Sequence, residues 1–153
     1  MVLFVLDAFV FNQGVLAAIT LMFVLFGFLP KALIAYFKRS SPRYYLKKSL
    51  IYAVMAVGVL GANYVNNQTA RQRAELLIGK IEAYRAAQGE YPARLEALVP
   101  GYIDAVPMSK YTLVHNRFFY IKGRSNVLLG YVHFPPFGRR IYSFETKKWE
   151  YLD

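Results

Sequence analysis

The sequence predicts an α+β membrane protein, in which two N-terminal transmembrane helices precede a small domain built from a helix and an antiparallel β-meander. Two long apolar stretches, separated by a basic loop, fill the first 65 residues. An amphipathic helical periodicity follows them, and short apolar or alternating runs between turn residues occupy the rest of the chain. The composition agrees, because 56% of the 153 residues are hydrophobic and 17% are aromatic, more than a soluble chain usually carries.

The first apolar stretch covers residues 1–37. A bilayer core of about 30 Å takes about 20 helical residues, which either Val2–Leu29 or Val15–Phe37 could supply, and we favour a span centred near Met22. No basic residue precedes the apolar run, which disfavours a cleaved signal peptide. Asp7 would be a functional candidate inside the bilayer, but it becomes interfacial if the span begins near Val15.

The second apolar stretch covers residues 49–65 and is uncharged from Leu50 to Val65. It is slightly short for a span, but Lys47 and Lys48 can extend their ammonium groups to the interface. The alternative is a pair of buried core helices in a soluble protein. The residues from 66 onward are too few to cover both helices on all sides, so two spans are the better interpretation.

The loop over residues 38–48 sets the expected orientation. Between the two spans the chain carries six basic residues and no acidic one, namely Lys31, Lys38, Arg39, Arg43, Lys47 and Lys48. Basic loops stay in the cytoplasm. We therefore expect a two-pass protein of the bacterial inner membrane, with its N-terminus and the domain over residues 66–153 in the periplasm. The net charge of +10 then needs no nucleic-acid partner to explain it.

The domain opens with an amphipathic helix that continues the second span. Its apolar positions recur at spacings of three and four: Ala70, Ala74, Leu77, Ile78, Ile81 and Tyr84. No proline lies between Arg43 and Tyr91, so one long helix can run to Gly89. Pro92 then opens a short helix, Ala93–Val99, whose Leu95, Leu98 and Val99 are expected to face inward.

The remainder predicts four or five short antiparallel strands. The candidate strands are Tyr111–His115, Arg117–Lys122, Val127–Phe134, Ile141–Glu145 and Trp149–Leu152. One face of this meander should cover the amphipathic helix. We expect the side chains of Leu77, Ile81 and Tyr84 to pack beneath those of Tyr120, Tyr131 and Phe144.

The order of these elements resembles the type IV pilins and the type II secretion pseudopilins. The resemblance covers about residues 50–153 and rests on "AYRAAQGEYPARLEALVP", with Tyr84, Gly89, Tyr91, Pro92, Leu95, Leu98, Val99 and Pro100 at the matching positions. It implies a helix packed on a small sheet, and docking to a pilus or a secretion machine. The family also carries a cleavage-site Gly, a Glu five residues into the mature helix and, in calcium-binding members, an acidic cluster. This chain has "RYYLKKSLIYAVM" there, so we expect a permanently anchored, unprocessed protein.

Catalytic chemistry finds little support in the sequence. The chain has no cysteine, and neither His115 nor His133 has an acidic residue at a triad or metal-ligand spacing. Glu90 and Glu96 flank the Tyr-Pro turn and could be read as paired carboxylates, although solvent exposure and capping are the expected roles. We therefore expect no enzyme, no cofactor and no metal.

Two functions remain open, and both are binding functions. One is an accessory component of a pilus or secretion system; the alternative is a membrane-anchored immunity protein that neutralises a toxin acting in the periplasm. The candidate partner site is the loop "HFPPFGRR" with His133, Phe137, Arg139 and Arg140, because aromatic and arginine side chains dominate interface energetics. A plain turn, with Phe137 folded back and both arginines solvated, is the competing interpretation. Self-association through the transmembrane helices is a further option.

Overall fold

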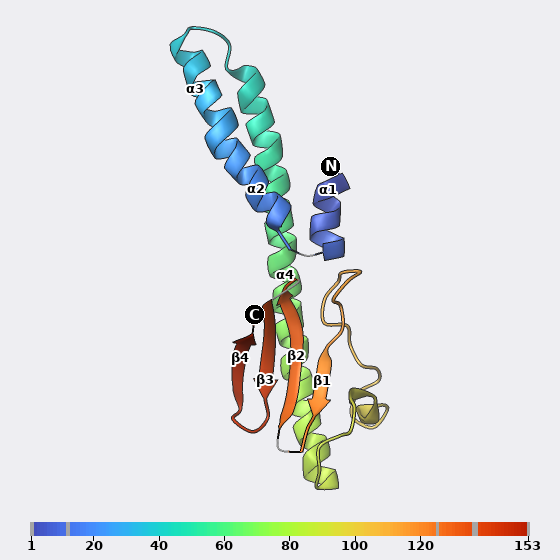
Figure 1. Ribbon diagram of the computed structural model, residues 1–153. Coiled ribbons are helices and arrows are strands. Elements are labelled where there is room, and N and C mark those ends of the chain that lie inside the picture. Colours follow the sequence, from blue (N-terminus) through green and yellow to red (C-terminus); the bar gives the residue numbers. More distant parts are fainter. Residues whose placement is uncertain (1, 12, 125, 136–137, 153) are drawn as a thin grey trace. The chain divides into compact units, whose positions relative to one another are not determined.

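The computed structural model describes residues 2–11, 13–124, 126–135 and 138–152 (Figure 1). The chain divides into two compact units, Met1–Tyr64 and Val65–Asp153. The first is helical, and the second is an α+β unit whose helical part belongs to the long helix α4, Arg43–Gln88.

The first unit begins with two short helical turns and then a long apolar helix. The turns are α1 (Val2–Val5) and the π-helical η1 (Leu6–Phe11). The long helix, Val15–Phe37, consists of α2 (Val15–Phe23), the π-helical η2 (Val24–Phe28) and α3 (Leu29–Phe37). This helix and α4 are both long and apolar enough to cross a membrane, as the sequence predicts.

Asp7 has a structural role at the start of α2. Its side chain is only 2% exposed, and its two carboxylate oxygens accept hydrogen bonds from the backbone N–H groups of Gly14 (2.7 Å) and Ala17 (3.2 Å). The first N–H groups of a helix have no partner within it, and a carboxylate is well suited to receive them. Asp7 therefore caps the N-terminus of the predicted first span.

Helix α4 is a single helix of 46 residues. It confirms the prediction that the second apolar stretch continues without a break into the amphipathic helix. Gly89 follows it with φ 79°, the left-handed conformation that ends helices and that glycine adopts at no steric cost.

The second unit is built around the last turns of α4. Its hydrophobic core contains Leu77 and Ile81 from α4, Leu95 and Leu98 from the next segment, and Val127, Leu129 and Phe144 from the sheet region. Tyr84 and Tyr120 pack against this core, as predicted. Tyr131 packs instead on Ala70 and Ala74 in a separate cluster, where the small alanine side chains leave room for its ring.

The short helix after Gly89 is a 3₁₀ helix, η3 (Leu95–Leu98). Leu95 and Leu98 are buried as predicted, whereas the prediction for Val99 is wrong because its side chain is exposed. Val99 has extended backbone angles, φ −94° and ψ 136°. The residue before a proline is driven out of the helical region, and Pro100 therefore turns Val99 away from the core.

The sheet has four antiparallel strands in the order β1-β2-β3-β4, and it lies against the part of α4 that belongs to the second unit (Figure 1). The strands are β1 (Phe119–Lys122), β2 (Val127–Phe134), β3 (Gly138–Ser143) and β4 (Lys148–Leu152). The predicted strand Tyr111–His115 is wrong: that segment is irregular. Strand β3 also begins three residues before the predicted Ile141 and ends at Ser143.

Candidate partner-binding surface

The four predicted site residues do not form one patch. In the sheet register, Tyr131 pairs with Arg140 and Val132 pairs with Arg139. Successive side chains of a strand point to opposite faces, so the two adjacent arginines project from opposite sides of the sheet. Arg139 is exposed and Arg140 is half-buried. Phe137 lies outside the described residues.

His133 lies on the same face of the sheet as Arg140. Its ring contacts those of Tyr131 and Tyr151, with centroid distances of 6.3 Å and 6.1 Å. Burial lowers the pKa of His133, and the positive charges of Lys110 and Arg140 lower it further. Both effects favour the neutral imidazole. Its Nδ1 atom is buried and has no hydrogen-bond partner among the described residues.

Lys110 is the residue that sequence reasoning missed here. It is 0% exposed, and its Nζ atom donates a hydrogen bond of 2.9 Å to the backbone carbonyl of His133. None of the ion pairs among the described residues includes it, and burial lowers its pKa to about 8. A buried, unpaired ammonium is costly, and nothing in the sequence around "MSKYTL" distinguishes this lysine from an exposed one.

Lys110 belongs to an irregular segment, residues 108–115, that displays apolar side chains. Leu113 is 77% exposed. The other exposed apolar side chains of the segment are those of Met108, Tyr111 and Val114. The sequence predicts a strand over Tyr111–His115, and the structure instead leaves the side chains of Tyr111, Leu113 and Val114 open to solvent.

Side chains of α4 hold the 108–115 segment in place. The backbone N–H of Tyr111 donates to Asn66 Oδ1 at 3.0 Å, and Arg73 Nη1 donates to the carbonyl of Met108 at 2.7 Å. The Arg73 guanidinium also lies 4.4 Å from the centre of the Tyr111 ring and donates to the Tyr111 hydroxyl. The segment therefore has no ladder of strand pairing, but it is fixed at several points along α4.

Glu90, one of the two acidic residues that flank the Tyr-Pro turn, is engaged structurally. Glu90 accepts a hydrogen bond of 2.9 Å from Lys122 Nζ, which also donates to the carbonyl of Tyr91 at 2.6 Å. The Tyr120 hydroxyl donates to the carbonyl of Pro92 at 2.9 Å. These bonds fasten the turn after α4 to strand β1. Within the described residues, no group of three or more His, Asp or Glu side chains could hold a metal ion.

No protein-family model, no curated protein and no solved structure matches this chain. The resemblance to pilins and pseudopilins therefore rests on the motif residues alone. A partner-binding surface is inferred from the geometry of the second unit.

Proposed function

We propose that this chain is a non-enzymatic protein anchored in the bacterial inner membrane, whose periplasmic domain binds a protein partner as an accessory component of a pilus or secretion system. Helix α4 supports this proposal, because it passes without a break from an apolar half into the core of an α+β domain. That is the arrangement the pilin-like motif leads one to expect. The six basic residues from Lys31 to Lys48, at the facing ends of the two apolar helices and in the turn that joins them, favour a cytoplasmic loop.

The observation that carries the binding proposal is the fixed 108–115 segment with its exposed apolar side chains. When a partner removes these side chains from water, the free energy of the complex is lowered. Because Asn66 and Arg73 already hold the backbone, binding orders little additional chain and loses little conformational entropy. An aromatic ring stacked with an arginine, as in Tyr111 and Arg73, is also typical of residues that dominate interface energetics.

Site-specific photo-crosslinking in cells tests this proposal. A photoreactive residue replaces Val114, and the crosslinked protein is identified by mass spectrometry. We expect a discrete adduct that disappears with Leu113→Asp, because a carboxylate at the centre of an apolar contact must lose its hydration. Ile121→Asp is the matched control, since Ile121 is an exposed apolar residue on β1, outside the segment.

The outcomes separate the alternatives. An adduct that survives Leu113→Asp, or that is lost equally with Ile121→Asp, would remove the segment as the binding surface. A captured pilus or secretion component supports the accessory function, whereas a captured toxin would replace it with the immunity function. Arg139→Glu and Arg140→Glu, tested singly, show whether either face of the sheet contributes.

The orientation has its own test. A cysteine in place of Ser40 should resist a membrane-impermeant thiol reagent added to intact spheroplasts, and one in place of Thr146 should react with it. The chain has no native cysteine, so the labelling reports only the introduced residue. The reverse labelling pattern would place the domain in the cytoplasm and would end the proposal of a periplasmic partner.

A further inference from the structure

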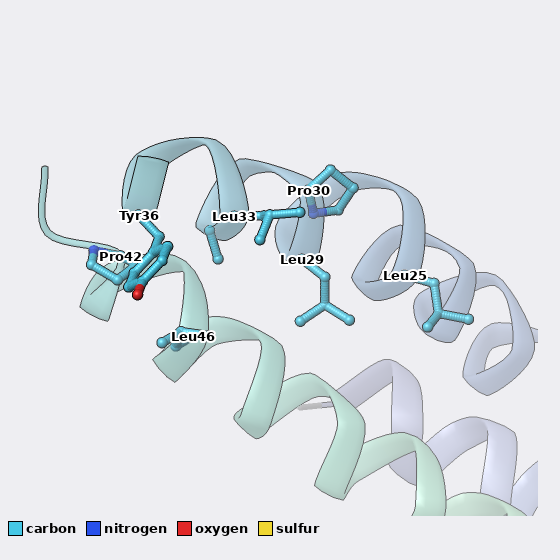
Figure 2. A pocket seen from close by; sticks show the side chains of 8 residues that line it. Leu25, Leu29, Pro30, Leu33, Tyr36, Pro42 and Leu46 are labelled. Atoms are coloured by element: carbon cyan, nitrogen blue, oxygen red, sulfur yellow. The ribbon is translucent and has the colours of Figure 1, made fainter. Parts of the chain in front are cut away.

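An apolar groove lies between α3 and the start of α4, within the first unit. It has a volume of about 560 Å³, and its walls are formed by Leu25, Leu29, Pro30, Ala32, Leu33, Tyr36, Pro42 and Leu46. Figure 2 shows the side chains of Leu29 and Tyr36 extending from the first helix toward the start of α4. None of the residues that form the groove carries a charge.

The residues that form the groove extend along several turns of the first apolar helix. From Leu25 to Tyr36 the chain advances eleven positions, which is roughly 16 Å of helix at 1.5 Å per residue. An open groove of this length with uncharged walls suits an extended hydrocarbon chain. Because lipid chains in a bilayer are already out of water, such a site would hold the acyl chain through van der Waals contacts.

Irregular backbone shapes this part of the helix. The π-helical turn η2 (Val24–Phe28) ends where the backbone N–H of Leu29 donates to the carbonyl of Val24. Pro30, the next residue, has no N–H to donate. π-helical turns and prolines both bend helices. π-helical turns also recur at functional sites. The groove therefore lies beside a stretch of irregular helix.

Three exposed basic residues lie at the interhelical turn, close in sequence to residues that form the groove. Lys38 and Arg39 follow Tyr36 after one residue, and Arg43 follows Pro42 directly. The sequence contains no acidic residue between Asp7 and Glu75, so these cations have no carboxylate partner nearby in the chain. Basic pockets between membrane helices bind anionic lipid headgroups.

We propose that this groove binds one acidic phospholipid, with an acyl chain along Leu25–Tyr36 and the phosphate at Lys38, Arg39 and Arg43. A second copy of the chain is the less favourable occupant, because it would bring another uncompensated set of basic residues to the same place. A neutral lipid would fill the groove but leave the charges unpaired. The proposal is independent of the partner that the second unit binds.

Native mass spectrometry of the full-length protein in detergent tests it. The protein is titrated with dioleoyl phosphatidylglycerol and, separately, with dioleoyl phosphatidylcholine, which has the same acyl chains. We expect a single tightly bound phosphatidylglycerol. Lys38→Gln combined with Arg39→Gln should weaken its binding roughly 10- to 30-fold, because each basic residue near an anionic headgroup contributes on the order of 1 kcal/mol.

A matched control is available in the second unit. Lys147 and Lys148 are adjacent exposed lysines where a turn meets the start of β4, and Lys147 has φ 54°, close to the 53° of Arg39. Lys147→Gln combined with Lys148→Gln therefore also removes two adjacent positive charges, one of them from a residue with positive φ. This variant should retain phosphatidylglycerol with unchanged affinity.

A second variant tests the acyl-chain half of the site. Leu33→Trp fills the groove from an exposed position and should weaken phosphatidylglycerol binding, whereas glycerol phosphate, which has no acyl chain, should not compete. Equal binding of the two lipids, equal losses in the Lys147/Lys148 control, or competition by glycerol phosphate would each overturn the proposal. A mass spectrum showing dimers without lipid would assign the groove to a second copy.

Discussion

The two units of this chain bury opposite kinds of side chain. The first unit buries small residues, among them Ala17, Ala32 and Ala56, and exposes large ones such as Phe26 and Leu50. The second unit buries large residues instead. Its fully or almost fully buried apolar side chains include Leu77, Ile81, Leu98, Leu129, Tyr131 and Phe144.

This difference reflects the solvent that each unit is suited to. In water, the free energy of folding comes from removing large apolar side chains from the solvent. In a bilayer the lipid chains are as apolar as leucine, so helices associate through small residues that allow close backbone approach. The burial pattern of the first unit therefore agrees with the composition of its helices, both of which are apolar enough to cross a membrane.

Among the substitutions that test this comparison, Ile81→Ala should change the unfolding free energy most. Ile81 is fully buried in the core of the second unit, and deletion of such a side chain typically costs about 2–5 kcal/mol of unfolding free energy. Urea unfolding of the full-length protein, followed by the fluorescence of its single tryptophan, Trp149, measures this cost. Trp149 packs against Tyr131 and Tyr142 and so reports on the second unit.

Leu76→Ala is the control for that measurement. Leu76 lies on the same helix and its side chain is 52% exposed, so its replacement should change the unfolding free energy little. An equal loss in the two variants would mean that burial along α4 is assigned to the wrong helix face.

Replacing two glycines, one in each unit, should give the next largest difference in stability. A Cβ atom at Gly130 would lie 2.2 Å from the Phe119 ring and 2.6 Å from the Arg140 carbonyl oxygen, whereas a Cβ at Gly61 of α4 would meet nothing within 4 Å. Gly130→Ala should therefore destabilise the second unit by about 1–3 kcal/mol through overpacking. Gly61→Ala should stabilise α4 slightly, because alanine has the higher helix propensity. Hydrogen exchange resolved by segment would measure both, and a tolerated Gly130→Ala would contradict the sheet packing.

Lys110→Met should make the second unit more stable at pH 7, by roughly 1–3 kcal/mol. The pKa of Lys110 is lowered from 10.5 to about 8 by burial, so the unfolded chain binds more protons between these pH values. The stability of the wild-type domain should therefore rise from about pH 8 to pH 10.5 and be lowest below pH 8. This rise should be absent from Lys110→Met in Trp149-monitored unfolding. A parallel pH dependence in the two proteins would mean that Lys110 is hydrated in solution.

Asp7→Ala gives the smallest expected effect, in the first unit. It removes the acceptor for the N–H groups of Gly14 and Ala17, and loss of such a cap typically costs about 0.5–2 kcal/mol. Faster amide exchange confined to the first turn of α2 would confirm the capping role. Unchanged exchange there would show that other groups satisfy these donors.

Sequence periodicity was sufficient for most of the fold. The unbroken α4, its end at Gly89 and the strands β1, β2 and β4 follow from helical spacing, alternation and turn residues. The segment Tyr111–His115 alternates equally well, but its backbone is held by Asn66 and Arg73, and His115 has φ 58°. The contacts join residues that are distant in sequence, and the positive φ of His115 turns the backbone. Alternation alone predicts neither feature.

The candidate surface was less accessible to sequence reasoning. The opposite directions of Arg139 and Arg140 follow from strand alternation once β3 is known to begin at Gly138, but the two prolines favoured a longer loop. The exposure of Leu113 and the burial of Lys110 depend on how an irregular segment folds back onto α4 and β2. Neither carries a local signal, because a leucine and a lysine in a short alternating run predict the reverse pattern of burial.

The borders of the sheet restrict the manner in which a partner can be recognised. The edge strands β1 and β4 have only four and five residues, and β4 carries Lys148 and Glu150. Short edges with charged side chains disfavour hydrogen bonding to a strand from another molecule. Recognition by strand addition, which reads backbone more than side chains, is thereby discouraged, and so is edge-to-edge aggregation of the domain with its own copies.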